Sequence, residues 1–152
     1  MCCIEAIEKA LDVVPSEQTK LLKKLTMYGL MIRDHALHIY LFSLPDVFNK
    51  DSVLDFTPEQ SHYLHDSFDI KRAGNKLSTV VAGRAVHAPF PGVGGYAQVP
   101  TNADLKALIP DLKLAREKLF GVLEEYYNSP VDYSRSTDFV ALVADNFDFL
   151  EG

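Results

Sequence analysis

The sequence predicts a mainly α fold (α+β in class): a helical bundle of four or five helices with a small β-hairpin or loop element. Three observations lead to this prediction. Apolar side chains recur at helical spacing in several long stretches, capping signals precede two of them, and a single proline- and glycine-rich segment interrupts them. Because 152 residues with 47% hydrophobic content can bury one core, and no change of composition divides the chain, residues 1–152 are expected to form a single domain.

The first half of the chain is expected to hold two helices. Ile4, Ile7 and Leu11 share one helical face within 3–13, and Pro15 ends this segment because the residue before a proline leaves the helical region. The next helix, 16–44, is expected to be the centre of the fold and to stop at Pro45-Asp46. Its predicted core stripe consists of Leu25, Tyr28, Ile32, Ile39 and Phe42.

Two further segments follow. Thr57, Pro58 and Gln60 form a cap-and-box signal that predicts a helix over 58–68. Residues 70–81 keep helical spacing, although the β-branched pair Val80-Val81 leaves a strand open as an alternative. Gly83 is a natural terminator for this segment.

The second half begins with a glycine- and proline-rich stretch. Residues 84–100 predict a tight loop or hairpin with short strands. Thr101, with Asp104 in the first turn, predicts the cap of a helix that runs to Ser129-Pro130 and is kinked or restarted at Pro110. Residues 139–143 predict a strand, and the apolar residues after it suggest that the chain continues in its parent protein.

Charge and composition exclude several classes of protein. The net charge of -6, with scattered lysines and arginines, gives no basic face for nucleic acid. No apolar run reaches the roughly 20 residues of a membrane span, and the N-terminus lacks the basic start of a signal peptide, so a cytoplasmic chain is expected. Cys2 and Cys3 are adjacent, and we interpret them as ordinary reduced cysteines.

Histidines are the candidates for chemistry. His35 and His38 form one His-x-x-His pair, and His62 and His65 form another, so each pair could present neighbouring imidazoles to a metal ion. His35 falls on the predicted core stripe, where an imidazole needs a hydrogen-bond partner; it would be either a buried histidine bonded to a backbone carbonyl or a group beside a cofactor.

One loop collects the remaining candidates. Arg84, His87, Gly94 and Gly95 lie together in it, and its glycines permit a close approach of the backbone to something else. A loop that merely turns the chain is the competing interpretation. The sequence holds no phosphate loop, no paired catalytic acids at useful spacing and no Ser-His-Asp signature.

Two stretches resemble one known family. Asp34-His35-Ala36-Leu37-His38 runs into Leu44-Pro45-Asp46, and Gly83-Arg84-Ala85-Val86-His87 runs into Val93-Gly94-Gly95. This order and spacing resemble the large, catalytic subunit of nickel-iron hydrogenases, over essentially the whole chain and closest to the cytoplasmic members that work with nicotinamide or deazaflavin partners. Asp34 stands where that family usually has serine, Ala82 where it has a first glycine, and Ala88 separates His87 from Pro89.

The resemblance implies an internal fragment of such a subunit. The family holds its nickel-iron centre with two Cys-x-x-Cys motifs, and this sequence has neither; Met1 falls just after the first and Gly152 well before the second. No catalytic residue and no metal ligand is therefore carried over, and no cofactor is expected on this chain alone. The implied supporting shell of the centre consists of His35, His38, Arg84, His87, Gly94 and Gly95.

Three functions remain open. The first is a fragment whose parent oxidises H2 or reduces protons reversibly; its partners would be the remainder of the large subunit, plus an iron-sulfur small subunit, and this chain alone is expected to be inactive. The second is a non-catalytic helical interaction or scaffold module derived from the same fold. The third is a small histidine-metal protein that uses both His-x-x-His pairs.

Overall fold

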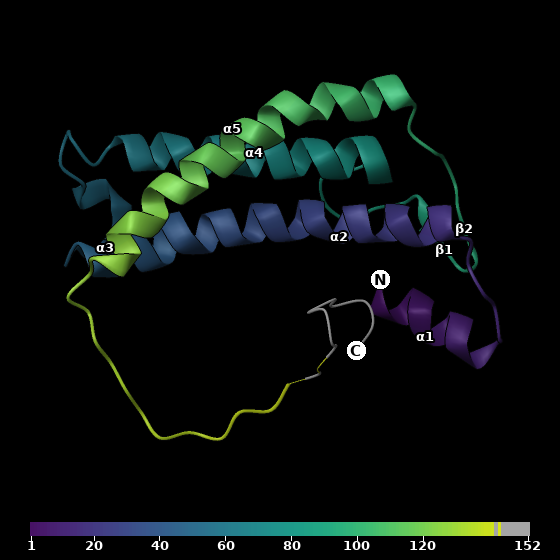
Figure 1. Ribbon diagram of the computed structural model, residues 1–152, viewed down its shortest axis with the longest axis horizontal. Coiled ribbons are helices and arrows are strands. Elements are labelled where there is room, and N and C mark those ends of the chain that lie inside the picture. Colours follow the sequence, from purple (N-terminus) through teal and green to yellow (C-terminus); the bar gives the residue numbers. More distant parts are fainter. Residues whose placement is uncertain (142, 144–152) are drawn as a thin grey trace.

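Two long antiparallel helices form the body of the molecule (Figure 1). The computed structural model describes residues 1–141 and 143. Helix α2 (Glu17–Leu37) lies beside α4 (His62–Ala82), and α5 (Asn102–Tyr127) crosses over this pair. The short helix α1 (Cys2–Ala10) lies on the other side of α2. The predicted mainly helical fold with a small β element is therefore confirmed.

Helix α1 ends earlier than the sequence predicted. Asp12 adopts a left-handed conformation with φ 53°, and the amide of Val13 donates to the carbonyl of Glu8 at 2.9 Å. These features form a Schellman turn, which closes the helix after Ala10. The predicted end near Val13 is wrong because this local turn stops the helix before Pro15 can act.

Helix α2 does not stop at Pro45. Ser16 caps its start by accepting a hydrogen bond from the amide of Thr19 at 3.2 Å. The chain then continues through a π-helix, η1 (His38–Ser43), into α3 (Leu44–Val47), with Pro45 in the first turn of α3. The predicted stop is wrong because the wider π-turn bonds the amide of Leu44 to the carbonyl of Ile39, so the chain passes the proline without breaking its helical path.

The buried face of α2 also differs from the predicted stripe. Phe42 is 67% exposed and Tyr28 is exposed as well. The buried positions are instead mostly small or polar: Thr19, Leu22, Lys23, Thr26, Gly29 and Ala36. The prediction is wrong because the helix carries several apolar stripes, and the face that packs is the one that lets α4 approach closely.

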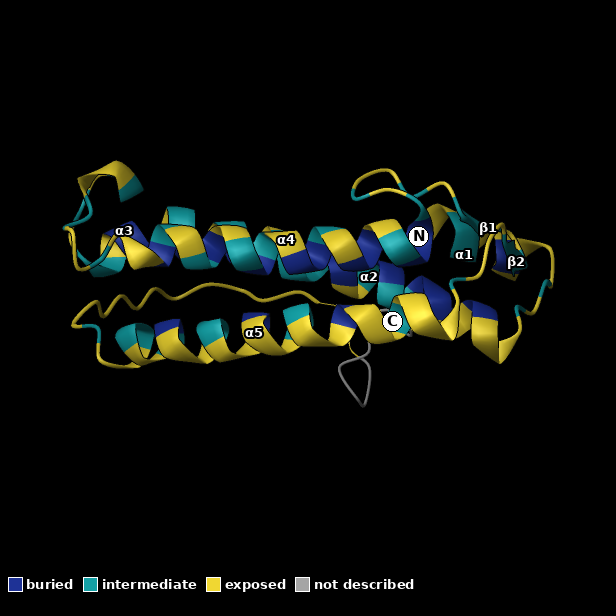
Figure 2. Cartoon of the chain, turned by 90° about the horizontal axis from the view of Figure 1, so that it is seen from above, coloured by how far each residue is buried: buried dark blue, intermediate teal, exposed yellow. Residues whose placement is uncertain are grey.

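Two glycines make this approach possible. A Cβ atom on Gly74 would lie 2.8 Å from the backbone nitrogen of Arg33 and 2.8 Å from the carbonyl oxygen of Gly29. A Cβ atom on Gly29 would lie 2.9 Å from the backbone nitrogen of Ser78. In Figure 2 the buried positions gather where α4 lies over α2. Backbone therefore packs against backbone at this crossing.

Helix α4 joins two predicted segments into one. The capping box of Thr57 and Gln60 forms, with bonds of 3.1 and 3.3 Å between each backbone amide and the other side chain. The first turn after it is not α-helical, so the helix begins at His62 rather than Pro58. Val81 lies fully buried within the helix, which excludes the alternative strand. Gly83 terminates it as predicted, with φ 88°.

The second half of the chain follows its local signals. Strand β1 (Pro91–Gly92) pairs with β2 (Gly95–Tyr96) in an antiparallel hairpin. Thr101 and Asp104 form a capping box at the start of α5, and the helix runs through Pro110 without a restart. The two short connectors are α3 and a 3-10 turn, η2 (Val53–Asp55).

The predicted strand over 139–143 is absent from the part of it that the structure describes. Residues 139–141 and 143 have no regular secondary structure, and Phe139 is 91% exposed. Leu142 and residues 144–152 lie outside the described residues. The prediction is wrong for the described positions because a strand needs a hydrogen-bonded neighbour, and no described segment pairs with them.

Polar contacts join α5 to α4. The ammonium of Lys118 lies 2.6 Å from Asp66 and 2.5 Å from Asp69. Tyr63 donates to Glu125 at 2.7 Å, and Tyr40 donates to the carbonyl of Lys118 at 3.0 Å. These bonds surround an apolar cluster to which α5 contributes two fully packed positions, Ala115 and Val122.

We expect Gly74→Ala to lower the free energy of unfolding by about 2 kcal/mol, because its methyl group would press on the backbone of α2. Urea denaturation followed by helical circular dichroism measures this change. Gly121→Ala is the matched control: nothing lies within 4 Å of its new methyl group, so it should raise stability by about 0.5–1 kcal/mol. An unchanged Gly74→Ala protein would contradict the close crossing.

The acid stability of the chain should depend on Asp69. The hydrogen bond from Lys118 lowers the pKa of Asp69 below its usual value, against the opposing effect of burial. A lowered folded-state pKa contributes stability that is present above the unfolded value of about 3.9 and is lost as pH falls through the lower folded-state pKa. Asp69→Asn should therefore cost about 1 kcal/mol at neutral pH and flatten the acid limb of the stability curve. Asp55→Asn, on the exposed η2 turn, should leave that limb unchanged.

Candidate functional site

The loop after α4 holds Arg84 and His87 in place through helix α2. Arg33 donates from Nη1 to the carbonyl of Ala85 at 2.9 Å, and its Nε lies 2.7 Å from the carboxylate of Asp34. His87 has a positive φ of 55°, which is uncommon for a residue with a side chain and marks a sharp turn. The chain thus bends between two charged side chains that both remain exposed.

Arg84 and His87 line one cavity of about 380 Å³. Its other walls come from the start of α1, at Met1 and Ile4, and from α2, at Thr26 and Leu30 among others. The lining is largely apolar, with the guanidinium and imidazole groups as its main polar features. The structure therefore brings two of the predicted site residues together, and it places the first residues of the chain beside them.

His35 and His38 do not join this cavity. Both imidazoles are exposed, and the ring of His38 lies 6.2 Å from that of Phe42, centroid to centroid. The expectation that His35 faces the core is wrong because the buried face of α2 runs through Gly29 and Ala36 instead. The two histidines lie on the helix far enough from Arg84 and His87 that they line no wall with them.

The second histidine pair is exposed on the first turn of α4. His62 Nδ1 lies 2.6 Å from the carbonyl oxygen of Glu59, and the ring stacks near Tyr63 with centroids 4.0 Å apart. Within residues 1–141 and 143, no three histidine, cysteine or acidic side chains are close enough to hold a metal ion. The two His-x-x-His pairs therefore do not combine into one site there. Cys2 and Cys3 are both exposed.

The two glycines of the hairpin have different surroundings. Gly94 has a φ of 68°, and a Cβ atom on it would lie 2.7 Å from the side chain of Val13. Its amide donates to the carboxylate of Glu8 at 2.7 Å. Nothing lies within 4 Å of a Cβ atom on Gly95. The close approach predicted for this loop is thus made by Gly94, and its partner is helix α1.

Sequence reasoning missed the polar centre of this region, which is a buried ion pair. Glu8 and Lys23 are 5% and 3% exposed, and the ammonium group contacts the same carboxylate oxygen that accepts the Gly94 amide. Burial alone would raise the pKa of Glu8, but the hydrogen bonds from Lys23 and Gly94 lower it below its usual value. No periodic signal could have found the pair, because its members lie on different helices.

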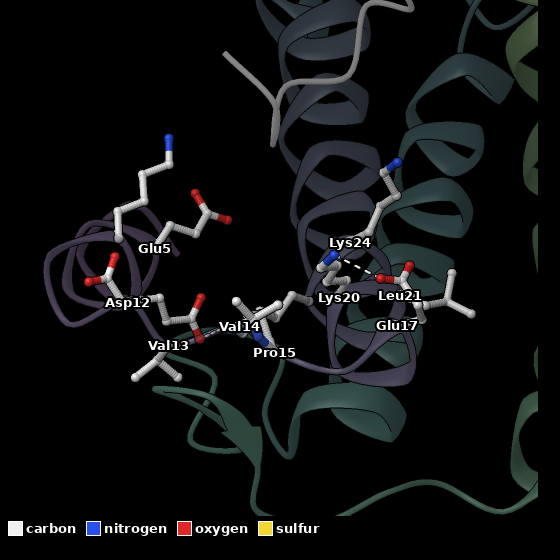
Figure 3. Close-up of a pocket in the computed structure, with 12 residues that line it drawn as sticks. Glu5, Asp12, Val13, Val14, Pro15, Glu17, Lys20, Leu21 and Lys24 are labelled. Atoms are coloured by element: carbon white, nitrogen blue, oxygen red, sulfur yellow. Dashed lines mark hydrogen bonds and ion pairs between the residues drawn. The ribbon is translucent and has the colours of Figure 1, made fainter.

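A groove of about 670 Å³ runs beside this ion pair between α1 and α2 (Figure 3). Figure 3 shows Glu5 and Asp12 on the α1 side, facing Lys20 and Lys24 across the opening. The charges of its walls balance, with four acidic and four lysine side chains: Glu5, Glu8, Asp12, Glu17, Lys9, Lys20, Lys23 and Lys24. The groove therefore has no preference for a ligand of one sign.

Comparison with known proteins identifies the class of the chain. It is 32% identical to the alpha subunit of sulfhydrogenase 2 from Pyrococcus furiosus, over 69% of this chain and 26% of that protein. It is 30% identical to the alpha subunit of sulfhydrogenase 1 from the same organism, over 83% of this chain and 31% of that protein. A vhu subunit of the F420-non-reducing hydrogenase from Methanocaldococcus jannaschii is 30% identical over 73% of this chain and 28% of that protein. No family model matches the chain.

The chain thus belongs with the alpha, or large, subunits of hydrogenases, which confirms the resemblance seen in its sequence. It spans between a quarter and a third of the length of the relatives named above. None of the helices among the described residues is both long and apolar enough to cross a membrane.

We expect Arg33→Met to loosen the loop that carries Arg84 and His87, because the carbonyl of Ala85 then loses a charged donor. Amide hydrogen exchange over 85–89 should accelerate by about tenfold. Arg72→Met is the matched control, since the side chain of Arg72 is 68% exposed and pairs with Asp69 of its own helix. Equal exchange in the two variants would show that Arg33 does not hold the loop.

Proposed function

We propose that the chain is an internal segment of a hydrogenase large subunit, and that it places the Arg84–His87 loop beside a nickel-iron centre. Reversible oxidation of H2 belongs to the assembled enzyme. In this proposal the chain follows the first Cys-x-x-Cys motif and precedes the second. The observation that carries the proposal is the similarity to hydrogenase alpha subunits over 69% and 83% of the chain.

The cavity at the start of α1 supports this assignment. Met1 and Ile4 share its walls with Arg84 and His87. A cysteine motif that ends just before Met1 would therefore open onto the same cavity as the guanidinium and imidazole groups. Such groups orient metal ligands, tune their potential and pass protons, and they need the thiolates of the centre to act upon.

The described residues do not fit the metal centre as a ligand set. Cys2 and Cys3 are adjacent and exposed, and no third ligand is near them within residues 1–141 and 143. A nickel-iron centre needs thiolates from two separate motifs that meet in space, so its ligands would come from the flanking parts of the parent protein. No catalytic step is assigned to a residue of this chain, and Arg84 and His87 are proposed as supporting groups only.

Exposed apolar side chains support partners for the segment. Val14, Leu54 and Tyr127 are each at least 84% exposed, and Phe42 is 67% exposed. These positions are spread over both ends of the bundle, as expected of a piece that larger neighbours cover. The neighbours that we propose are the remainder of the large subunit, plus an iron-sulfur small subunit, in the cytoplasm.

A non-catalytic scaffold module is the second candidate. The observation that favours it is the packing of α2, α4 and α5 around two apolar clusters of their own. A chain with such a core can fold and present a surface without metal. The histidine-metal alternative has no comparable support, because its two pairs do not form a joint site among the described residues.

Two measurements on the source organism separate the candidates. The first is the reading frame on both sides of this sequence, which should contain an upstream Cys-x-x-Cys and a downstream Asp-Pro-Cys-x-x-Cys. The second is nickel and iron analysis of the protein purified through a tag within the natural gene, together with H2-dependent dye reduction. We expect stoichiometric nickel, an iron-sulfur partner and dye reduction.

The opposite result would replace the proposal. A stop and a start codon that bound this sequence, with a purified 17.0 kDa chain that holds neither nickel nor an iron-sulfur partner, would exclude the hydrogenase segment and favour the scaffold module.

A further inference from the structure

The carboxylate of Glu8 joins three segments that are distant in the sequence. It belongs to α1, contacts the ammonium of Lys23 on α2, and accepts the amide of Gly94 in the hairpin turn at 2.7 Å. One oxygen, Oε1, makes both contacts. This is the point at which helix α1 is tied to the rest of the molecule by charge.

Apolar packing gives α1 little alternative attachment. Its buried residue is Glu8, whereas Ile7 and Leu11, on the stripe that the sequence marked as apolar, are 44% and 64% exposed. A buried charge without its partner is strongly unfavourable, so Glu8 and Lys23 can be buried only together. The position of α1 thus depends on this pair more than on its hydrophobic face.

The hairpin has its own attachment to α2. The hydroxyl of Tyr96 lies 2.5 Å from that of Thr26, and Tyr96 is among the residues packed on the cluster of Leu22 and Leu77. Loss of Glu8 would therefore release α1 while the hairpin stays on α2. This difference makes the role of Glu8 separable from general folding.

We propose that Glu8 is a positioning residue that fixes the start of α1 against the Arg84–His87 loop. Through Lys23 it sets where α1 lies along α2, and through Gly94 it sets the distance between α1 and the hairpin that follows the loop. The inference rests on the proposed function for its consequence: a cysteine motif that precedes Met1 would be held at a fixed distance from Arg84 and His87 by this carboxylate.

The test measures a distance and amide exchange in the full 152-residue chain. Spin labels on Cys2 and on Val86→Cys, in a Cys3→Ser background, report the separation of the α1 start from the loop; both native cysteines are exposed and Val86 is 49% exposed. Exchange of the amides of 4–13 and of Gly94 reports docking. The variants are Glu8→Gln and, as a matched control on the same helix, Glu5→Gln.

We expect Glu8→Gln to broaden the distance distribution and to speed exchange over 4–13 by at least about tenfold, because Lys23 is left buried beside a neutral partner. Exchange in α4 and α5 should be unchanged. Glu5→Gln should match the unmodified chain in both measurements. A Glu8→Gln chain with the distance distribution and exchange of the unmodified chain would overturn the proposal.

A charge exchange separates positioning from folding, even where Glu8→Gln fails to fold. The double variant Glu8→Lys with Lys23→Glu keeps an ion pair between α1 and α2 but offers Gly94 no acceptor from α1. Its helical circular dichroism should match the unmodified chain, while the Gly94 amide exchanges at least about tenfold faster. Protection of Gly94 as in the unmodified chain would show that Glu8 does not hold the hairpin.

These outcomes are independent of hydrogenase activity. If Glu8 positions α1 in the isolated chain but the purified protein lacks nickel and H2-dependent activity, the proposed function fails and the positioning role stands. If nickel and activity are present but the distance does not respond to Glu8→Gln, the positioning role fails alone.

Discussion

The backbone contact between Gly29 and Gly74 is the constraint on which the other elements depend. It sets the depth at which α4 lies on α2, and thereby the place where α4 ends at Gly83 and releases the loop. Helix α5 then packs on α4 through Ala115 and Val122 and is held there by Lys118. A larger residue at either glycine would separate the two long helices and move the loop with them.

Local signals in the sequence predicted the ends of elements well. The capping boxes at Thr57 and Thr101, and the terminating Gly83, involve partners within three or four residues, so the pattern contains the whole interaction. The buried face of α2 could not be found in this way. Gly74, which selects that face, lies far along the chain from Gly29, and the apolar stripe through Tyr28 and Phe42 had equal claim by spacing alone.

The candidate site divides along the same line. Arg84 and His87 share a loop, and the structure brings them into one cavity, so their grouping followed from closeness in sequence. His35 and His38 were grouped with them by resemblance, yet both lie exposed on the surface of the described chain. Glu8 and Lys23 had no signal at all, because a buried ion pair between two helices looks in sequence like two ordinary surface charges.

The π-helix over His38–Ser43 has a consequence for insertions and deletions. A π-turn holds one residue more than an α-turn would over the same rise, so it behaves as a one-residue insertion inside a continuous helix. Removal of one residue there would restore α-helical geometry and rotate everything after it by roughly 100° about the helix axis. Leu44, which is fully buried, would then leave the core. The length of this stretch is therefore as constrained as its composition.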